Sequence, residues 1–161
     1  MSAASSLDRL PASGRLVAFD LGDVRIGTAV SDPEQVIASP EATLETPGGP
    51  AATPAVVAGR LAVELGRLGA VGAVVGDPRD LGGRAGERSR HAAAVALALE
   101  AASGVPVVLW DERFTTVEAE RVLLEADVSR RGRRAVVDRV AASVLLQGVL
   151  AARTVRRERG A

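Results

Sequence analysis

The sequence predicts an α/β domain in which a mixed five-stranded sheet, made of a three-stranded antiparallel meander and two parallel strands, carries helices on both faces. Three short strand-like runs with brief links follow one another near the start of the chain. Helical and apolar segments then alternate, and two further helical segments end the chain. Alternation of helix and strand implies crossover connections, which pair strands in parallel, whereas brief links pair them antiparallel.

The meander is predicted from three segments near the N-terminus. These strands are expected at residues 16–19, 25–31 and 36–38. The first is an apolar run that leads into Asp20, Leu21 and Gly22, which is typical of a buried strand that delivers an acid to its end. The second follows a tight turn, and the turn-forming pair Asp32 and Pro33 separates it from the third.

The parallel half of the sheet is predicted from the alternation that follows a loop rich in Pro and Gly at residues 45–54. Helices and strands are expected in turn at residues 56–68, 71–76, 86–102 and 105–110. The first helix shows Val and Leu at helical spacing before Gly69, the second is rich in Ala, and both strands are apolar. A capping-box pattern from Thr115 to Glu118 opens a further helix, and the last helix begins near Ala135, after an arginine-rich link.

The residue types that the chain lacks limit its chemistry. Its 161 residues fit one domain. There is no Cys, one His, and all 20 basic residues are Arg, which excludes a thiol nucleophile, a multi-histidine metal site and a P-loop lysine. With no Tyr, two Phe and one Trp, there is no aromatic platform for stacking bases. Carboxylates, hydroxyls, backbone amides and arginine remain.

Residues 15–151 are expected to form the domain, with a disordered leader at 1–14 and a mobile tail at 152–161. No long apolar stretch is present, so no membrane partner is expected. The lack of Cys and of a secretory signal favours a cytoplasmic location. The formal net charge is zero, so any attraction to nucleic acid must come from local charge segregation.

Three acids stand where side chains rarely need to be acidic. Asp20 and Glu112 each follow a buried strand, and Asp138 lies in the last helix beside Ala141 and Ala142. Because sites form outside the carboxyl ends of strands, Asp20 and Glu112 should emerge at one edge, where the last helix can bring Asp138. Converging carboxylates repel one another unless a cation is present, and oxygen ligands select Mg²⁺ or Mn²⁺. A two-metal site of this kind suits phosphodiester hydrolysis.

Each of these acids also has a structural interpretation. Asp20 can belong to an ordinary turn at a strand end. Glu112 can precede a helix whose dipole favours acids, and Asp138 can do the same or pair with Arg134 four residues earlier. Only the joint arrangement favours a functional site.

Charge segregation indicates a polyanionic partner. One basic cluster lies in the link before the last helix, at Arg130, Arg131, Arg133 and Arg134. A second basic stretch, with several glycines, contains Arg79, Arg84, Arg88 and Arg90. Glycine lets a loop approach a ligand closely, and the guanidinium fork matches phosphate oxygens, although two solvated loops are the alternative. His91 is interpreted as an incidental helix residue and Trp110 as a core residue.

Four stretches of the chain match a known family in order and spacing, over about residues 15–151. They are the run Arg15 to Asp32 with its Asp20-Leu-Gly motif, residues 75–78, the block Trp110-Asp-Glu-Arg-Phe-Thr-Thr-Val-Glu-Ala119, and the run from Asp138 to Gln147. Asp-Leu-Gly alone is a weak signal, whereas the third and fourth stretches together are specific. These motifs resemble those of the YqgF/RuvX proteins, a family of proposed pre-16S rRNA nucleases related to Holliday junction resolvases.

The resemblance implies an RNase H-like fold and a nuclease that uses two divalent ions. On the matching positions it implies that Asp20 is the central metal ligand, Glu112 the second acid and Asp138 the third. Phosphate-contacting or structural roles are implied for a set of arginines and hydroxyls, namely Arg25, Arg113, Thr115 and Thr116.

Two positions depart from the family pattern. Asp77 stands where the family usually has an apolar residue, and it either adds a metal ligand or, as we expect, forms a turn before Pro78. Asp23 replaces a more usual neutral or basic residue, which would weaken the attraction of phosphate near Asp20.

The expected function is cleavage of structured nucleic acid, with processing of the 5′ end of pre-16S rRNA as its role. A Holliday junction resolvase acting on branched DNA is one alternative, and a non-catalytic ribosome-assembly or transcription factor is another. Phosphoryl transfer of the actin or sugar-kinase kind is disfavoured, because it needs two related domains. The chain is expected to act as a monomer or homodimer.

Overall fold

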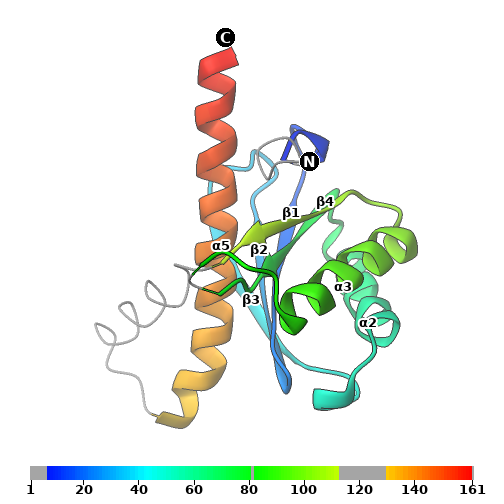
Figure 1. The fold of residues 1–161 in the computed structure, drawn as a ribbon. Helices are drawn as coiled ribbons and strands as arrows, with labels where there is room; N and C mark the ends of the chain where they lie inside the picture. The colour runs from blue at the N-terminus through cyan, green and yellow to red at the C-terminus, as the bar shows by residue number, and fades with distance from the viewer. Residues whose placement is uncertain (1–6, 81, 113–129, 161) are drawn as a thin grey trace.

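The computed structural model describes residues 7–80, 82–112 and 130–160, and for residues 130–139 it describes the backbone alone. A five-stranded sheet forms the centre, in the order β3-β2-β1-β4-β5 (Figure 1). The strands are β1 (Leu16–Leu21), β2 (Arg25–Ser31), β3 (Ala38–Glu45), β4 (Gly72–Asp77) and β5 (Val107–Asp111). The helices are the short η1 (Leu7–Arg9) and η2 (Gly49–Ala51) and the longer α2 (Pro54–Leu68), α3 (Glu87–Ser103) and α5 (Arg130–Gly160).

The pairing of the strands confirms the mixed sheet. β1 pairs antiparallel with β2, and β2 pairs antiparallel with β3. β4 lies parallel to β1 on one side and to β5 on the other. The carboxyl ends of the three parallel strands β1, β4 and β5 therefore meet at one edge of the sheet, which we call the carboxyl edge, opposite to the amino edge where they begin.

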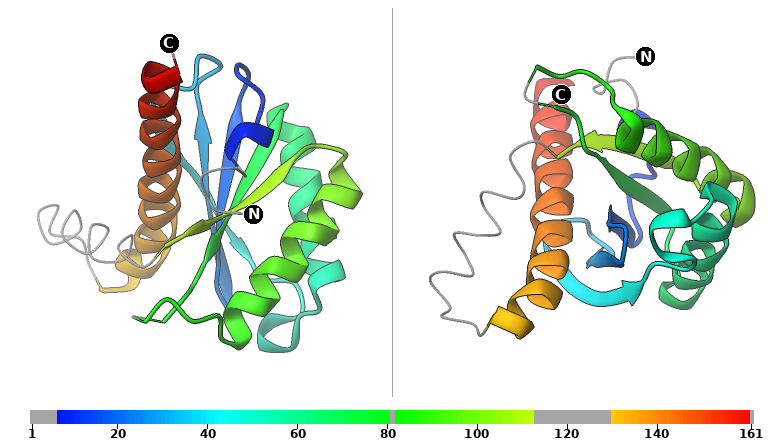
Figure 2. Two further views of the ribbon diagram at one scale, coloured as in Figure 1. Left: turned by 45° about the horizontal axis from the view of Figure 1, so that its top comes forward. Right: turned by 60° about the horizontal axis from the view of Figure 1, so that its bottom comes forward.

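Side chains of the sheet alternate between two cores. On one face, Val17 and Phe19 of β1 pack with the apolar sides of α2 and α3. On the other face, Leu16 and Ala18 pack with α5. Figures 1 and 2 show α2 and α3 covering one face and the long α5 crossing the other. The prediction of helices on both faces is confirmed, and residues one apart on β1 belong to different faces.

The third strand lies later in the chain than predicted. β3 begins at Ala38, whereas residues 36–38 were expected to form the strand. The backbone N–H groups of Val36 and Ile37 both donate to Asp32 Oδ1, at 2.8 Å each. Their side chains are 61% exposed. An aspartate turn thus satisfies the amides that the expected strand would have used, and the sheet resumes only after it.

The other four strands and the helices α2 and α3 begin and end within two residues of their predicted bounds, but α5 differs, and the short helices η1 and η2 were not predicted. It begins at Arg130 instead of near Ala135, so the arginine-rich segment forms its first turns and is not a link. Arginine is a good helix former, and the single Gly132 costs about 1 kcal/mol in a helix. The helix expected at residues 115–124 lies outside the described residues. In the part of the chain that the structure describes, no helix combines the length and the apolar character needed to cross a membrane.

Parts of the expected leader and tail pack on the domain. Leu7 and Leu10 are buried in the core beneath α5. The Nη2 atom of Arg153 donates to the carbonyl oxygens of Leu10 and Pro11, at 3.1 and 2.9 Å. α5 itself continues to Gly160. Residues on both sides of the expected domain thus contact it, and the boundary at residues 15–151 stays a prediction.

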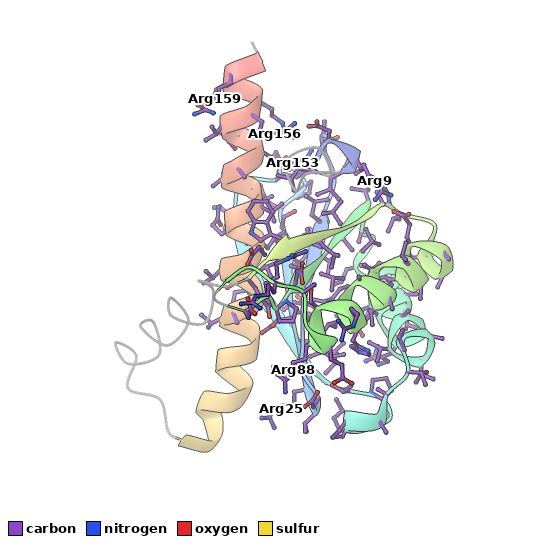
Figure 3. The ribbon with its side chains drawn as sticks, viewed as in Figure 1. Arg9, Arg25, Arg88, Arg153, Arg156 and Arg159 are labelled. Carbon is purple, nitrogen blue, oxygen red and sulfur yellow. The ribbon has the colours of Figure 1, made fainter. Side chains whose placement is uncertain are left out.

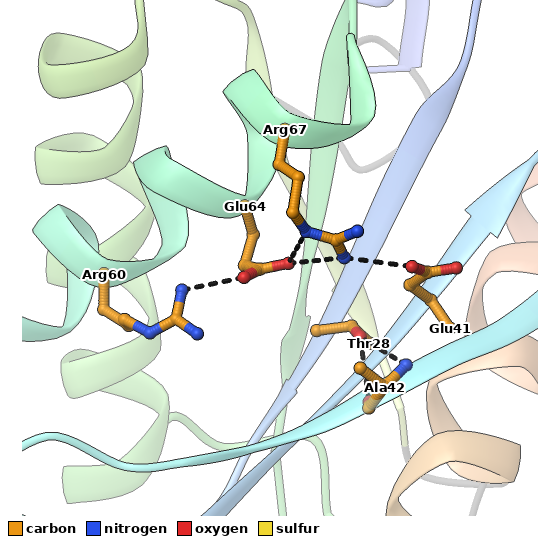
Figure 4. Close-up of polar contacts among 6 residues, drawn as sticks. All are labelled: Thr28, Glu41, Ala42, Arg60, Glu64 and Arg67. Carbon is orange, nitrogen blue, oxygen red and sulfur yellow. Dashed lines mark hydrogen bonds and ion pairs between the residues drawn. The ribbon is translucent and has the colours of Figure 1, made fainter.

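The buried carboxylate of Glu64 takes part in a network of ion pairs that links α2 to β3. Glu64 is 5% exposed, and its two oxygens accept hydrogen bonds from Arg60, at 2.8 Å, and from Arg67, at 2.8 and 3.0 Å (Figure 4). Arg67 also pairs with Glu41 of β3 at 2.9 Å. Burial raises the pKa of Glu64, but the two guanidinium groups outweigh this and hold the pKa below its ordinary value.

Candidate active site

Two predicted acids meet at the carboxyl edge of the sheet. Asp20 is the penultimate residue of β1, and Glu112 directly follows β5. Leu16 and Ala18 of β1 point to the α5 face, so the period of two places Asp20 on that face as well. The backbone N–H of Glu112 donates to the carbonyl of Asp77 at 3.2 Å, which prolongs the β4–β5 ladder and fixes the position of Glu112.

Gly76 of β4 makes room for the Glu112 carboxylate. A Cβ atom at position 76 would collide with Glu112 Oε2, and it would lie 2.8 Å from Leu145 Cδ1 of α5. The carboxylate therefore lies over the strand backbone, between β4 and α5. Only glycine leaves this space free, so the glycine is needed for the close approach rather than for an unusual backbone angle.

Burial and the neighbouring carboxylates raise the pKa of Glu112. Burial is the largest cause, and repulsion by Asp20, the hydrogen bond between the two side chains, and the charges of Asp77 and Asp111 act in the same direction, so that together they raise the pKa of Glu112 to about 8. Two carboxyl groups that share a proton are typical of a site that a positive charge would relieve.

Asp77 serves a structural purpose on the opposite face. It is 4% exposed, and its Oδ1 accepts a hydrogen bond from Ser89 of α3. Its Oδ2 accepts one from Arg79 Nε at 2.8 Å. The backbone N–H of Arg79 also donates to the carbonyl of Asp77 at 3.0 Å, which closes a turn around Pro78. Both carboxylate oxygens are thus engaged within the protein, in agreement with the turn that we expected.

Asp138, the third predicted acid, is placed by its backbone alone. Its position in α5 precedes Ala142 by four residues and Leu145 by seven, so the helical repeat puts it on the stripe of α5 that packs against the sheet. Seven residues correspond to about 10 Å along the axis. Among the described side chains, no group of three acids or histidines is arranged to hold a metal ion, so the three-acid site stays a prediction.

A cavity of about 420 Å³ opens beside Glu112. Three segments line it: the turn between β1 and β2, residues 46–52 with η2, and the first turns of α3. Arg88 and His91 of α3 contribute polar side chains, and Arg88 makes an exposed ion pair with Asp23 at 3.1 Å. The volume lies in the range of small-molecule sites.

The remaining predicted residues divide into two groups. Arg25 begins β2, and Figure 3 shows it with Arg88 at the carboxyl edge, where α5 begins. The backbone of the basic cluster forms the start of α5, and the side chains of this cluster lie outside the description. The residues wholly outside the described part are Arg113, Thr115 and Thr116.

Two features of the site are absent from the predicted set. Gly76 matters because it seats the Glu112 carboxylate, and a glycine in an otherwise apolar strand was the available signal. His91 lines the cavity next to Glu112, although it was interpreted from the sequence as an incidental helix residue. Its place there depends on how α3 lies against the β1–β2 turn, which the helical pattern of α3 does not reveal.

Comparison with known proteins decides the family. The family model that matches residues 14–152 is described as RuvX: Holliday junction resolvase. The chain belongs to the RuvX family. A relative from Cereibacter sphaeroides (strain ATCC 17025), named "Putative pre-16S rRNA nuclease", is 42% identical over 144 residues, which cover 89% of this chain and 87% of the relative. A relative of the same name from Pelotomaculum thermopropionicum is 43% identical over 136 residues, which cover 84% of this chain and 86% of the relative.

Solved structures agree with this assignment at the level of the fold. RuvC from Thermus thermophilus in complex with a Holliday junction substrate superposes with a TM-score of 0.51 and 19% identity, over 87% of this chain and 95% of RuvC. A second structure of Thermus thermophilus RuvC gives a TM-score of 0.51, with 18% identity. The RNase H-like fold that the family resemblance implied is thereby confirmed. Membership of a nuclease family is shown by the family model and the named relatives.

Proposed function

We propose that this RuvX-family chain is a divalent-metal-dependent endonuclease that hydrolyses phosphodiester bonds in structured nucleic acid. The observation that carries the proposal is the pair of carboxylates at the carboxyl edge, where Asp20 and Glu112 share a hydrogen bond in a partly buried position. Such a pair is unfavourable alone and becomes favourable beside a cation.

The oxygen atoms of this pair fit Mg²⁺ or Mn²⁺. Asp20 and Glu112 offer only carboxylate oxygens, and the whole chain has no Cys and a single His. We propose Asp138 as the third ligand, because its position on α5 faces the sheet two turns before Leu145. A pair of ions held there would supply the positive charge that activates water and stabilises the charge developing on the phosphate.

The chain's own residues then position the substrate. Gly76 lets the Glu112 carboxylate lie against β4, where the neighbouring Leu145 restricts its movement. The cavity beside Glu112 takes the nucleotide next to the scissile phosphate, with Arg88 and His91 in contact with it. The other phosphate contacts that we propose are Arg25, Arg113, Thr115, Thr116, Arg130, Arg131, Arg133 and Arg134.

The proposed substrate is the 5′ end of pre-16S rRNA, processed in the cytoplasm by a monomer or homodimer. The names of the relatives support this choice. A four-way DNA junction is the second candidate, supported by the description of the family model. Contacts to phosphate do not distinguish the two, because they carry no base identity.

Cleavage by the Asp20→Asn variant tests the mechanism. Labelled precursor rRNA, a four-way junction and duplex DNA are incubated with each protein, with and without Mn²⁺. We expect Asp20→Asn to reduce cleavage at least about 100-fold while the far-UV circular dichroism stays that of the folded chain. The matched control is Asp80→Asn, which changes an exposed aspartate outside the site and should cleave like the wild type.

Two outcomes would contradict the proposal. Metal-dependent cleavage retained by Asp20→Asn would remove this residue from the mechanism. If the wild type cleaves none of the three substrates and calorimetry shows no saturable Mg²⁺ binding, the non-catalytic nucleic-acid-binding alternative is favoured instead.

A further inference from the structure

A second cavity lies at the other end of α5, near the amino edge of the sheet. Its volume is about 420 Å³, and it lies between the last turns of α5 and residues 7–12. Four arginines of α5 line it: Arg153, Arg156, Arg157 and Arg159. Figure 3 shows three of them there, remote from Arg25 and Arg88 at the carboxyl edge. We call these residues the α5 arginine cluster.

Arg153 lines this cavity, and one nitrogen of its guanidinium group is an unused donor. The side chain is 8% exposed, and its Nη2 atom is held by the carbonyls of Leu10 and Pro11. Within the described residues its Nη1 atom, which is buried, has no hydrogen-bond partner. A buried charged donor without an acceptor is strongly unfavourable. An acceptor in the cavity would remove this penalty.

The charges around the cavity do not balance. Among the described residues that line it, the one acid is Asp8, which pairs with Arg156 at 2.6 Å. Arg157 donates to the carbonyl of Ala12 at 3.1 Å, and no carboxylate of the described residues forms an ion pair with it. Four guanidinium groups thus face one carboxylate. Burial lowers the pKa of Arg153 and the neighbouring Arg157 lowers it further, whereas Asp8 acts in the opposite direction.

We propose that the α5 arginine cluster binds a phosphate group, supplied by the backbone of the nucleic acid on which the carboxyl edge acts. A phosphate offers several oxygens in a tetrahedral arrangement. This arrangement suits several guanidinium groups that project from one helix into a shared cavity. The backbone is preferred over a free phosphate because the cluster is elongated along α5 and partly open. The choice of nucleic acid as the source of the phosphate rests on the proposed nuclease function. Binding of a phosphate group by the arginines does not.

The two sites are separated by a length that α5 fixes. Leu145 lies beside the position of the Glu112 carboxylate. Arg153 follows it by eight residues and Arg159 by fourteen, which correspond to about 12 and 21 Å along the helix axis. Phosphates of one strand of a duplex succeed one another about every 3.4 Å along its axis. The cluster should therefore contact phosphates roughly four to six base pairs from the cleavage position.

A comparison of short and long oligonucleotides tests this geometry. Fluorescence anisotropy is measured without divalent ions on hairpins with stems of four and of twelve base pairs. Arg159→Gln is the main variant, since Arg159 makes no hydrogen bond or ion pair among the described residues and its loss should leave the fold intact. We expect Arg159→Gln to weaken binding of the long stem about three- to tenfold and to lower its salt slope by about one, with little effect on the short stem.

Two further variants make the result specific. Arg60→Gln removes one positive charge from α2, on the opposite face, and should bind both stems like the wild type; because Arg60 is also a partner of the buried Glu64, binding is measured well below its own thermal unfolding temperature. Arg153→Gln should weaken binding of the long stem by at least as much as Arg159→Gln. Because its loss also frees residues 10 and 11 from α5, its thermal unfolding is recorded alongside.

Titration with inorganic phosphate distinguishes a site for free phosphate from a site for the phosphates of a nucleic acid. If phosphate raises the thermal unfolding temperature of the wild type but not of Arg159→Gln, and both proteins bind the long stem equally, the cavity takes a free phosphate and its role toward nucleic acid is overturned. If neither phosphate nor the long stem distinguishes the variants from the wild type, the whole inference fails. If the wild type cleaves no substrate but its binding still depends on stem length, the proposed nuclease function is contradicted and the phosphate contact of the α5 arginine cluster is not.

Discussion

Replacing Glu112 by Gln should make the metal-free protein more stable at neutral and alkaline pH. In the folded chain, burial and the nearby carboxylates raise the pKa of Glu112 from its ordinary value of 4.5 to about 8. Between these two values the folded state keeps a proton that the unfolded state has lost. The free energy of unfolding of the wild type therefore falls as the pH rises from about 5 to 8, and this dependence should be absent from Glu112→Gln.

The size of the effect follows from the shift. A difference of 3.5 pKa units corresponds to at most about 5 kcal/mol. Glu112 is only partly buried, so solvent and small movements reduce this value, and we expect about 2 kcal/mol. Below about pH 5 the carboxyl is protonated in both states, and glutamine resembles the protonated carboxyl in shape and as a donor to Asp20. The variant and the wild type should thus be equally stable at pH 5 and separate steadily up to pH 8.

Urea unfolding at a series of pH values measures this difference. Trp110, the single tryptophan, lies next to Gly148 of α5, so its fluorescence reports the packing near the site. Glu45→Gln, at the exposed end of β3, is the control and should keep the slope of the wild type. Saturating Mg²⁺ should stabilise the wild type more at pH 8 than at pH 5 and stabilise Glu112→Gln less. An unchanged pH slope in Glu112→Gln, or a variant less stable than the wild type at pH 8, would refute the reasoning.

Two other substitutions test the packing around the site. Gly76→Ala should fold with a loss of about 1–3 kcal/mol and lose most cleavage activity, because its methyl group displaces the Glu112 carboxylate and meets Leu145; full activity would show that this seat is not needed. Glu64→Gln should cost about 1–3 kcal/mol in urea unfolding at pH 7, since it leaves two guanidinium groups without their buried partner. Its destabilisation should fade as the pH falls below 4.5, the ordinary value for a glutamate, and through the lowered pKa at which the wild-type carboxyl is also protonated. Glu41→Gln, its more exposed control, should cost well under 1 kcal/mol, and an equal loss in both variants would contradict this account.

Local patterns in the sequence were sufficient to predict the sheet and the meeting of the two acids. Apolar runs of strand length that are separated by helical segments predict strands that pair in parallel. The carboxyl ends of such strands lie at one edge of the sheet. Asp20 and Glu112 meet there for this reason. The period of two also explains why Asp77, which is close in space, points to the other face and is held by Ser89 instead.

Features that depend on contacts between distant segments could not be predicted in this way. The third strand begins late because Asp32 holds the two amides that precede it, a competition that hydrophobic pattern does not reveal. An arginine-rich C-terminus resembles a solvated tail, and its burial depends on the carbonyls of Leu10 and Pro11, more than 140 residues earlier in the chain. The guanidinium of Arg153 is buried only because the start of the chain folds beneath α5.

The packing of α5 sets the distance between the two ends of the proposed substrate path, which are the carboxylates and the α5 arginine cluster. Ala142, Leu146 and Val149 are fully buried against the sheet, so the helix cannot slide by a turn without exposing this stripe. A displacement of one turn would move the α5 arginine cluster by about 5 Å relative to the carboxylates, more than one phosphate spacing in a duplex. The same apolar stripe that completes the core therefore sets the distance between the cleavage position and the second phosphate contact. If the stem length at which Arg159→Gln begins to weaken binding does not match this distance, the helix is not the element that sets it.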